Sequence, residues 1–144
     1  MTFTPDYRHL ADAARNIPAK RLPLYEHQID VSIMEAITGE RFAELQQGDA
    51  SDKREFFRHY ASFYRSMGYD TVSFEGCVPG PGALQTPSKG VIETREDFER
   101  YPWGGVEAEY WRQFTDDFEA LASVMPAGMK AVGGVGLGRV RERV

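Results

Sequence analysis

Apolar residues recur along this chain with the period of an amphipathic helix in several segments. Over residues 51–68 they stand at positions i, i+1, i+4, i+7, i+8 and i+11, which places them on one stripe over three turns. Weaker repeats of the same period predict helices over residues 5–15, 29–37 and 106–125. We expect a short helical turn at 42–48, and a short helix at 94–101 that Thr94 and Asp97 cap.

Three short segments instead have the residue types of β-strands: residues 20–27, 69–75 and 129–132. Residues 69–75 are the clearest, because this β-rich run is bounded by glycine on both sides. The first segment contains Pro23, which lacks a backbone N–H and must lie at a sheet edge or near a strand start. The predicted order is strand, helix, strand, helix, strand, which is typical of a parallel sheet covered by helices.

Such a sheet is small for a chain of 144 residues. The alternating order fits a doubly wound sheet or a barrel, and a complete (β/α)8 barrel needs about 250 residues. We therefore expect an α/β fold, the N-terminal part of a (β/α)8 TIM barrel that is truncated after about three strands. It would form one domain over residues 1–144, and its open sheet edges would favour self-association.

Charge and composition narrow the classes of partner. The chain has 17 Lys and Arg residues against 22 Asp and Glu residues, a net charge of −5, which argues against nucleic-acid binding. The sequence predicts neither a membrane-spanning segment nor a signal peptide, so no membrane partner is expected. Cys77 is the single cysteine, and a lone thiol is typical of a reducing compartment. We expect a cytoplasmic protein.

Candidate catalytic residues lie where two of the predicted strands end. Glu26 and His27 end the first strand, and Glu75 ends the second. Active groups of parallel α/β sheets gather at the carboxyl ends of the strands. We therefore expect these carboxylates and this imidazole to transfer protons or to hold polar atoms of a substrate. For each of the three taken alone, a helix cap or a surface pair is the favoured explanation, and it is their joint position at strand ends that supports a functional role.

The glycine run that begins at Gly133 does not fit a phosphate-binding motif. A G-x-G-x-x-G pattern that starts at Gly134 would require glycine where Arg139 stands. Close approach of the backbone to a ligand is the better explanation. We therefore expect Gly133 and Gly134, together with Gln28, to contact the substrate.

Metal and thiol chemistry have weak support. The chain contains no CxxC or HExxH spacing, so we expect no metal site.

Cys77 begins a segment rich in proline and glycine, over residues 77–90, which predicts a long loop. A plain loop thiol is favoured over a metal ligand or a nucleophile, because thiolate activation requires a cationic neighbour. His9 and His59 are expected to be surface residues.

Several segments share a recognisable pattern with one enzyme family. They read RLPLYEHQ (21–28), KREFF (53–57), MGYDTVSFEG (67–76), GVI (90–92), REDFERYPW (95–103) and MKAVGG (129–134). Together they resemble the N-terminal part of uroporphyrinogen decarboxylase-like proteins, over nearly the whole chain up to Gly136. The resemblance implies a (β/α)8 barrel. It also implies either a cofactor-free lyase of porphyrin biosynthesis or a zinc-dependent corrinoid methyltransferase.

Two departures from the family pattern distinguish these branches. The decarboxylases have an Arg-Gln-Ala-Gly-Arg type segment after the first strand, whose guanidinium groups bind the substrate carboxylates. In this chain the corresponding segment, residues 26–30, begins with Glu26 and ends with Asp30. Glu75 stands where the decarboxylases have an essential Asp. The resemblance therefore implies the methyltransferase branch rather than an authentic uroporphyrinogen decarboxylase.

The resemblance implies a small-molecule substrate, namely a tetrapyrrole, a corrinoid or a methyl donor, and a corrinoid protein as a partner. Zinc would belong to a full-length methyltransferase-type relative, whose ligands lie in its C-terminal half, so we expect no cofactor in this chain. Residues 139–144 depart from the family pattern, which predicts a truncated gene or a shifted reading frame. The fragment would then be inactive alone. The alternative is a non-catalytic α/β binding or assembly module.

Overall fold

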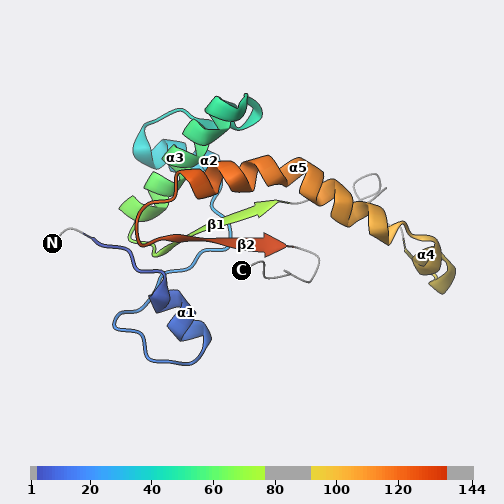
Figure 1. Ribbon diagram of the computed structural model, residues 1–144, viewed down its shortest axis with the longest axis horizontal. Helices are drawn as coiled ribbons and strands as arrows, with labels where there is room; N and C mark the ends of the chain where they lie inside the picture. Colours follow the sequence, from blue (N-terminus) through green and yellow to red (C-terminus); the bar gives the residue numbers. More distant parts are fainter. Residues whose placement is uncertain (1–2, 77–91, 136–144) are drawn as a thin grey trace. The chain divides into compact units, whose positions relative to one another are not determined.

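The computed structural model describes residues 3–76 and 92–135 of the chain, and Figure 1 shows the order of its elements. They are α1 (Arg8–Ala14), α2 (Val31–Thr38), the 3-10 helix η1 (Ala43–Gln47), α3 (Ala50–Ser66), β1 (Thr71–Gly76), α4 (Arg95–Arg100), α5 (Trp103–Ser123) and β2 (Lys130–Val135). The two strands are neighbours in a parallel, two-stranded sheet. The chain forms two compact units, residues 1–75 with 116–134, and residues 76–115 with 135–144.

The aromatic stripe of α3 forms the core of the first unit, as its period predicts. Asp49 caps the helix, with its side chain accepting hydrogen bonds from the backbone N–H groups of Ser51 and Asp52. The ring of Phe57 packs edge-on against Phe74 of β1, with 4.9 Å between centroids, and Phe118 of α5 lies 5.6 Å from Phe74. The apolar face of α3 is thereby buried on the strand. Six of its residues are buried: Phe56, Phe57, Tyr60, Ala61, Phe63 and Tyr64.

The barrel prediction is wrong, because the structure has a sheet of two strands where three were expected. Residues 20–27 form no strand. Pro23 removes a ladder donor, and the side chains that a strand would bury are exposed, with Leu22 at 84% and Leu24 at 43%. The residue types of this segment favour a strand, but it contributes neither a ladder nor a buried face. The described fold is a partial α/β arrangement of helices on a two-stranded sheet.

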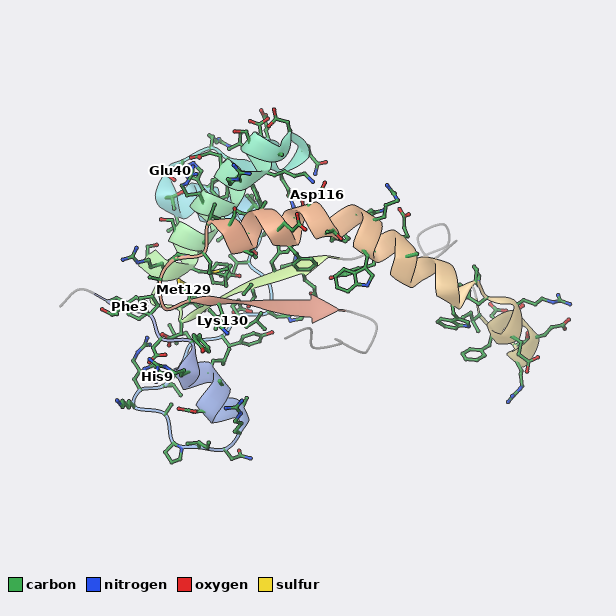
Figure 2. The ribbon with its side chains drawn as sticks, in the orientation of Figure 1. Phe3, His9, Glu40, Asp116, Met129 and Lys130 are labelled. Carbon is green, nitrogen blue, oxygen red and sulfur yellow. The ribbon has the colours of Figure 1, made fainter. Side chains whose placement is uncertain are left out.

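The N-terminal segment is fixed across the starts of both strands. The Asp70 side chain, which precedes β1, is fully buried and accepts a hydrogen bond from the backbone N–H of Asp6 at 2.6 Å, as well as one from the Arg21 guanidinium. The backbone N–H of Tyr7 donates to the carbonyl of Gly128, which precedes β2, at 2.9 Å. Lys130 lies over the Tyr7 ring at 4.5 Å, on the side of the sheet where α1 lies (Figure 2).

A partly buried ion pair joins α3 to α5 within the first unit. The Lys53 ammonium lies 2.7 Å from the Asp117 carboxylate, and their side chains are 24% and 8% exposed. Removing one partner of such a pair leaves a poorly solvated charge, which costs far more than an exposed pair contributes. The pair fixes how α3 and the C-terminal part of α5 lie against each other.

Glu35 links α2 to η1. The left-handed residue Gly39 ends α2 with φ 73°, and the Glu35 carboxylate then accepts hydrogen bonds from the backbone N–H groups of Phe42, at 2.6 Å, and Ala43, at 2.8 Å. These bonds, from Ala43 and from Phe42, lower the pKa of Glu35. They hold the 2% exposed Phe42 5.7 Å from the ring of Phe56.

The second unit contains α4 and most of α5. Thr94 and Asp97 form the predicted capping box at the start of α4. The Trp103 indole donates a hydrogen bond to the Phe98 carbonyl at 3.0 Å, and its ring lies 4.5 Å from that of Tyr101. The helix α5 begins at Trp103, earlier than predicted, so the two glycines that follow it are helical. The predicted loop at 77–90, with Cys77, lies outside the described residues.

Replacing Phe57 with alanine will destabilise the first unit by about 3–5 kcal/mol, because a fully buried ring leaves a cavity when it is removed. Chemical denaturation monitored by circular dichroism measures the change. The matched control is Ile37→Ala, whose side chain is 57% exposed and whose loss will cost less than about 0.5 kcal/mol. Equal effects of the two substitutions would contradict the aromatic core.

Stability will depend on the ionisation of Glu35. The backbone hydrogen bonds from Ala43 and Phe42 hold the folded-state pKa of Glu35 below its usual range, so the unfolded chain binds the proton more tightly. The stabilisation is present above the unfolded pKa and is lost as the pH falls through the folded pKa. Denaturation curves between pH 7 and pH 3 will show the Glu35→Gln variant less stable than wild type at pH 7, with a difference that shrinks toward pH 3. A constant difference would argue against this role.

Candidate functional site

The structure brings His27 and Glu75 together at the carboxyl end of β1. The Nε2 atom of His27 lies 2.9 Å from Oε2 of Glu75, and their side chains are 62% and 19% exposed. The hydroxyl of Tyr25 lies 3.3 Å from Nδ1 on the other side of the ring. In the neutral imidazole, a proton on Nε2 that is donated to Glu75 leaves Nδ1 to accept from Tyr25. The two partners hold the orientation of an exposed imidazole.

A cavity of about 200 Å³ lies beside this pair. The residues that precede and begin α2 form one wall, η1 contributes one side chain, and aromatic rings of α3 and β1 complete it. The lining comprises Gln28, Ile29, Asp30, Val31, Gln46, Phe56, Tyr60, Phe74 and Glu75. The volume corresponds to roughly half a dozen water molecules, which is below the range of drug-sized pockets. The cavity therefore suits a molecule of a few heavy atoms. His27 is not one of its lining residues, but it contacts Glu75, which is.

Two carboxylates and no Lys or Arg lie among the residues that line the cavity. Asp30 caps α2, and its Oδ1 atom accepts hydrogen bonds from the hydroxyl of Ser32 at 2.6 Å and from its backbone N–H at 2.8 Å. These two bonds, from the hydroxyl first, lower the pKa of Asp30, so this carboxylate is charged at neutral pH. The cavity therefore favours a cationic or hydrogen-bond-donating ligand over an anion.

The Tyr60 hydroxyl at the cavity has its own hydrogen-bond partner. Burial raises its pKa, which keeps the hydroxyl protonated, and it donates to the Ser73 carbonyl at 2.9 Å. Burial also raises the pKa of the Tyr64 hydroxyl. Neither tyrosine is therefore a proton-transfer group near neutral pH, which leaves the imidazole and the carboxylates.

The other predicted site residues have different positions. Gln28 lines the cavity. Glu26 is exposed, and its carboxylate accepts a hydrogen bond from the backbone N–H of its neighbour His27 at 3.2 Å. Gly133 and Gly134 lie within β2, not after its end, and neither belongs to the cavity lining. Of the predicted site, the structure therefore brings together His27, Glu75 and Gln28.

Several cavity residues were not predicted from the sequence as parts of a site. Asp30 had a local signal, since it stands at the N-cap position just before the apolar residues of α2. Phe56 and Tyr60 were assigned to the core because of their helical period, which they share with residues that line no cavity. Gln46 carries no signal in the sequence, because long-range packing alone brings it to the cavity. Tyr25 lies beside His27, outside the cavity lining.

The His59 side chain is 29% exposed, so it lies at the surface as predicted, but it has several partners there. Its Nδ1 atom lies 2.7 Å from a carboxylate oxygen of Glu40, and its Nε2 atom lies 3.3 Å from one of Glu55. The ring stacks on Phe42 with 5.2 Å between centroids. Figure 2 marks Glu40 in the α2–α3 part of the first unit. The His59 ring packs against its neighbours, and in this it differs from the more exposed ring of His27.

Within residues 3–76 and 92–135, no group of three or more His, Cys, Asp or Glu side chains could hold a metal ion. The described residues therefore do not fit the zinc that the family resemblance associates with methyltransferases. In the same part of the chain, no helix is long and apolar enough to cross a membrane.

Comparison with protein-family models, with curated proteins and with solved structures found no match to this chain.

The His27–Glu75 pair will contribute little to stability, since the imidazole is 62% exposed. A double-mutant cycle with His27→Ala and Glu75→Ala will give a coupling energy of about 0.2–1 kcal/mol in urea denaturation, smaller at high salt. A coupling above about 2 kcal/mol, independent of salt, would mark the pair as a structural ion pair instead.

Proposed function

We propose that this chain is part of a uroporphyrinogen decarboxylase-like enzyme of the methyltransferase kind, acting in the cytoplasm on a small methyl donor together with a corrinoid. The methyl donor binds in the cavity beside Glu75, and His27 acts as a general acid that donates a proton to the leaving group. The observation that carries the proposal is the 2.9 Å contact that holds an exposed imidazole against Glu75, a residue that itself lines the cavity.

The chemistry requires a proton because of the leaving group. A bound corrinoid would supply the nucleophile for the methyl group. For an uncharged donor, the electrons of the broken bond would stay on the donor's heteroatom, which would then need a proton that an imidazolium can supply as a general acid. Glu75, whose Oε2 atom lies 2.9 Å from Nε2 of His27, orients the imidazole. In this mechanism His27 contacts the donor, while Glu75 positions the ring.

The charge of the site supports the methyltransferase branch over decarboxylation of a polycarboxylate. Asp30 and Glu75 line the cavity without a lining Lys or Arg, so substrate carboxylates would be repelled there. The volume of about 200 Å³ also fits a small donor, whereas a whole tetrapyrrole or corrinoid macrocycle exceeds it. The corrinoid would therefore approach from outside the cavity.

An assembly module is the second candidate function. The observation in its favour is apolar exposure in the first unit: Ile33 is 52% and Ile37 is 57% exposed on α2, one helical turn apart. If the chain is an assembly module, small methyl donors will not bind beside His27 and will not change its chemical environment.

Footprinting with diethyl pyrocarbonate tests the proposal, because the three histidines of the chain report separately by mass spectrometry. The probes are methanol, dimethyl sulfide, choline chloride and hydroxocobalamin, each added alone. At about ten times its Kd, a probe that covers the site will slow modification of His27 about tenfold. His9 and His59 are internal controls whose rates will not change. If no probe slows His27, the proposed function is wrong.

A further inference from the structure

We propose that Arg21 and Asp70 are positioning residues of the candidate site. Their ion pair anchors the segment that carries Tyr25 and His27, so that the imidazole meets its two partners in one arrangement. This inference rests on the proposed function, because it names what positions the general acid of the same site. Neither residue lines the cavity. Asp70 immediately precedes β1, whereas Glu75 lies near the end of that strand.

The segment over residues 20–27 has few other contacts that could hold it. It forms neither a helix nor a strand, and no backbone–backbone hydrogen bond joins it to another described residue. Three of its large apolar side chains are exposed: Leu22, Leu24 and Tyr25. Its polar contacts to β1 and the residue before it are those of Arg21 with Asp70 and of His27 with Glu75. These two contacts therefore hold the segment beside the strand.

The spacing of the two contacts leaves the segment little slack. Asp70 and Glu75 are five positions apart, which corresponds to about 17 Å of extended chain. Arg21 and His27 are six positions apart, and six residues reach about 20–22 Å at full extension. Residues 22–26 contain neither a turn nor a bend. A displacement of Arg21 would therefore move the residues that follow it toward His27.

The burial of Asp70 is better explained by positioning than by stability. Its side chain is fully buried, and its Oδ1 atom accepts from the backbone N–H of Asp6 and from the Arg21 guanidinium. Its Oδ2 atom has no hydrogen-bond partner among the described residues. The cost of desolvating such charges offsets their attraction, so a buried pair adds little net stability but can fix one arrangement. Arg21 also lies over the Phe3 ring, at 4.7 Å, which holds the guanidinium from a second side.

The anchor acts on His27 through Tyr25. The Tyr25 hydroxyl lies 3.3 Å from Nδ1 of the imidazole, and a neutral ring that donates from Nε2 to Glu75 accepts there with its Nδ1 lone pair. His27 has a second anchor, because Asp30 caps α2 three positions later. Tyr25 lies farther from that helix, so it depends more on Arg21. Loss of the anchor would therefore release the Nδ1 lone pair first.

The test measures how fast diethyl pyrocarbonate modifies His27 when no other probe is present. The reagent acylates an imidazole nitrogen whose lone pair is free, so loss of the Tyr25 contact raises the rate. Arg21→Gln will raise the rate at His27 about two- to fivefold, the factor expected for loss of one exposed polar contact. His59 is the internal control and will keep its rate. Arg21→Lys retains a cation for Asp70 and will stay near the wild-type rate.

Two further variants separate positioning from general destabilisation. Lys53→Gln is the matched control, because it also leaves a buried carboxylate, that of Asp117, without its cation. Urea denaturation will show that both Lys53→Gln and Arg21→Gln lower stability, but only Arg21→Gln will change the rate at His27. Tyr25→Phe removes the hydroxyl and will raise the rate as Arg21→Gln does. In the Tyr25→Phe background Arg21→Gln will add little, because both substitutions release the same nitrogen.

The double variant Asp70→Asn with Arg21→Met removes both charges, while asparagine still accepts from the backbone N–H of Asp6. It tests the anchor even where the unpaired charge of Arg21→Gln unfolds the chain, and it will raise the rate at His27 to the same extent.

An unchanged rate at His27 in the folded anchor variants, or an equal rise in Lys53→Gln, would overturn this inference. The proposed function would then stand, because no methyl donor takes part in this experiment. Conversely, if no probe protects His27 in the footprinting experiment, the proposed function fails, whereas the effect of Arg21 on the imidazole is still measured.

Discussion

The packing of Phe74 between α3 and α5 is the contact on which the first unit depends. The single ring meets Phe57 at 4.9 Å, Tyr60 at 6.2 Å and Phe118 at 5.6 Å. Perpendicular arrangements such as these are the favoured geometry of aromatic pairs. Because strand residues alternate in direction, fixing Phe74 also fixes the direction of its neighbour Glu75. The core therefore positions the carboxylate that holds His27.

This dependence explains why a candidate site can exist beside a two-stranded sheet. A longer sheet fixes strand ends through ladders on both sides, whereas β1 is held largely by the rings that cover it. The start of the strand is fixed in another way, through the buried Asp70 and its bonds to Asp6 and Arg21. With both ends of β1 fixed, Glu75 has a defined position even though His27 comes from an irregular segment.

The sequence predicted those parts of the fold that depend on local pattern. The stripe on α3 and the capping box of α4 are properties of a few neighbouring residues, and both are confirmed. The prediction of a strand at 20–27 was wrong, because strand formation requires a partner and a buried face that residue types alone do not supply. Glu75 and His27 were predicted as a site from strand ends, although only Glu75 lies on a strand.

Gln46, which pattern analysis missed, reaches the cavity through contacts between distant segments. It comes from η1, whose position depends on the bonds that Glu35 makes to Phe42 and Ala43. Tyr25 lies two residues from His27 and contacts it within one segment without regular structure. The same two hydrogen bonds of Glu35 hold Phe42 against Phe56, and Phe56 lines the cavity. A change at Glu35 would therefore act on the shape of the cavity through packing, without altering any charge that lines it.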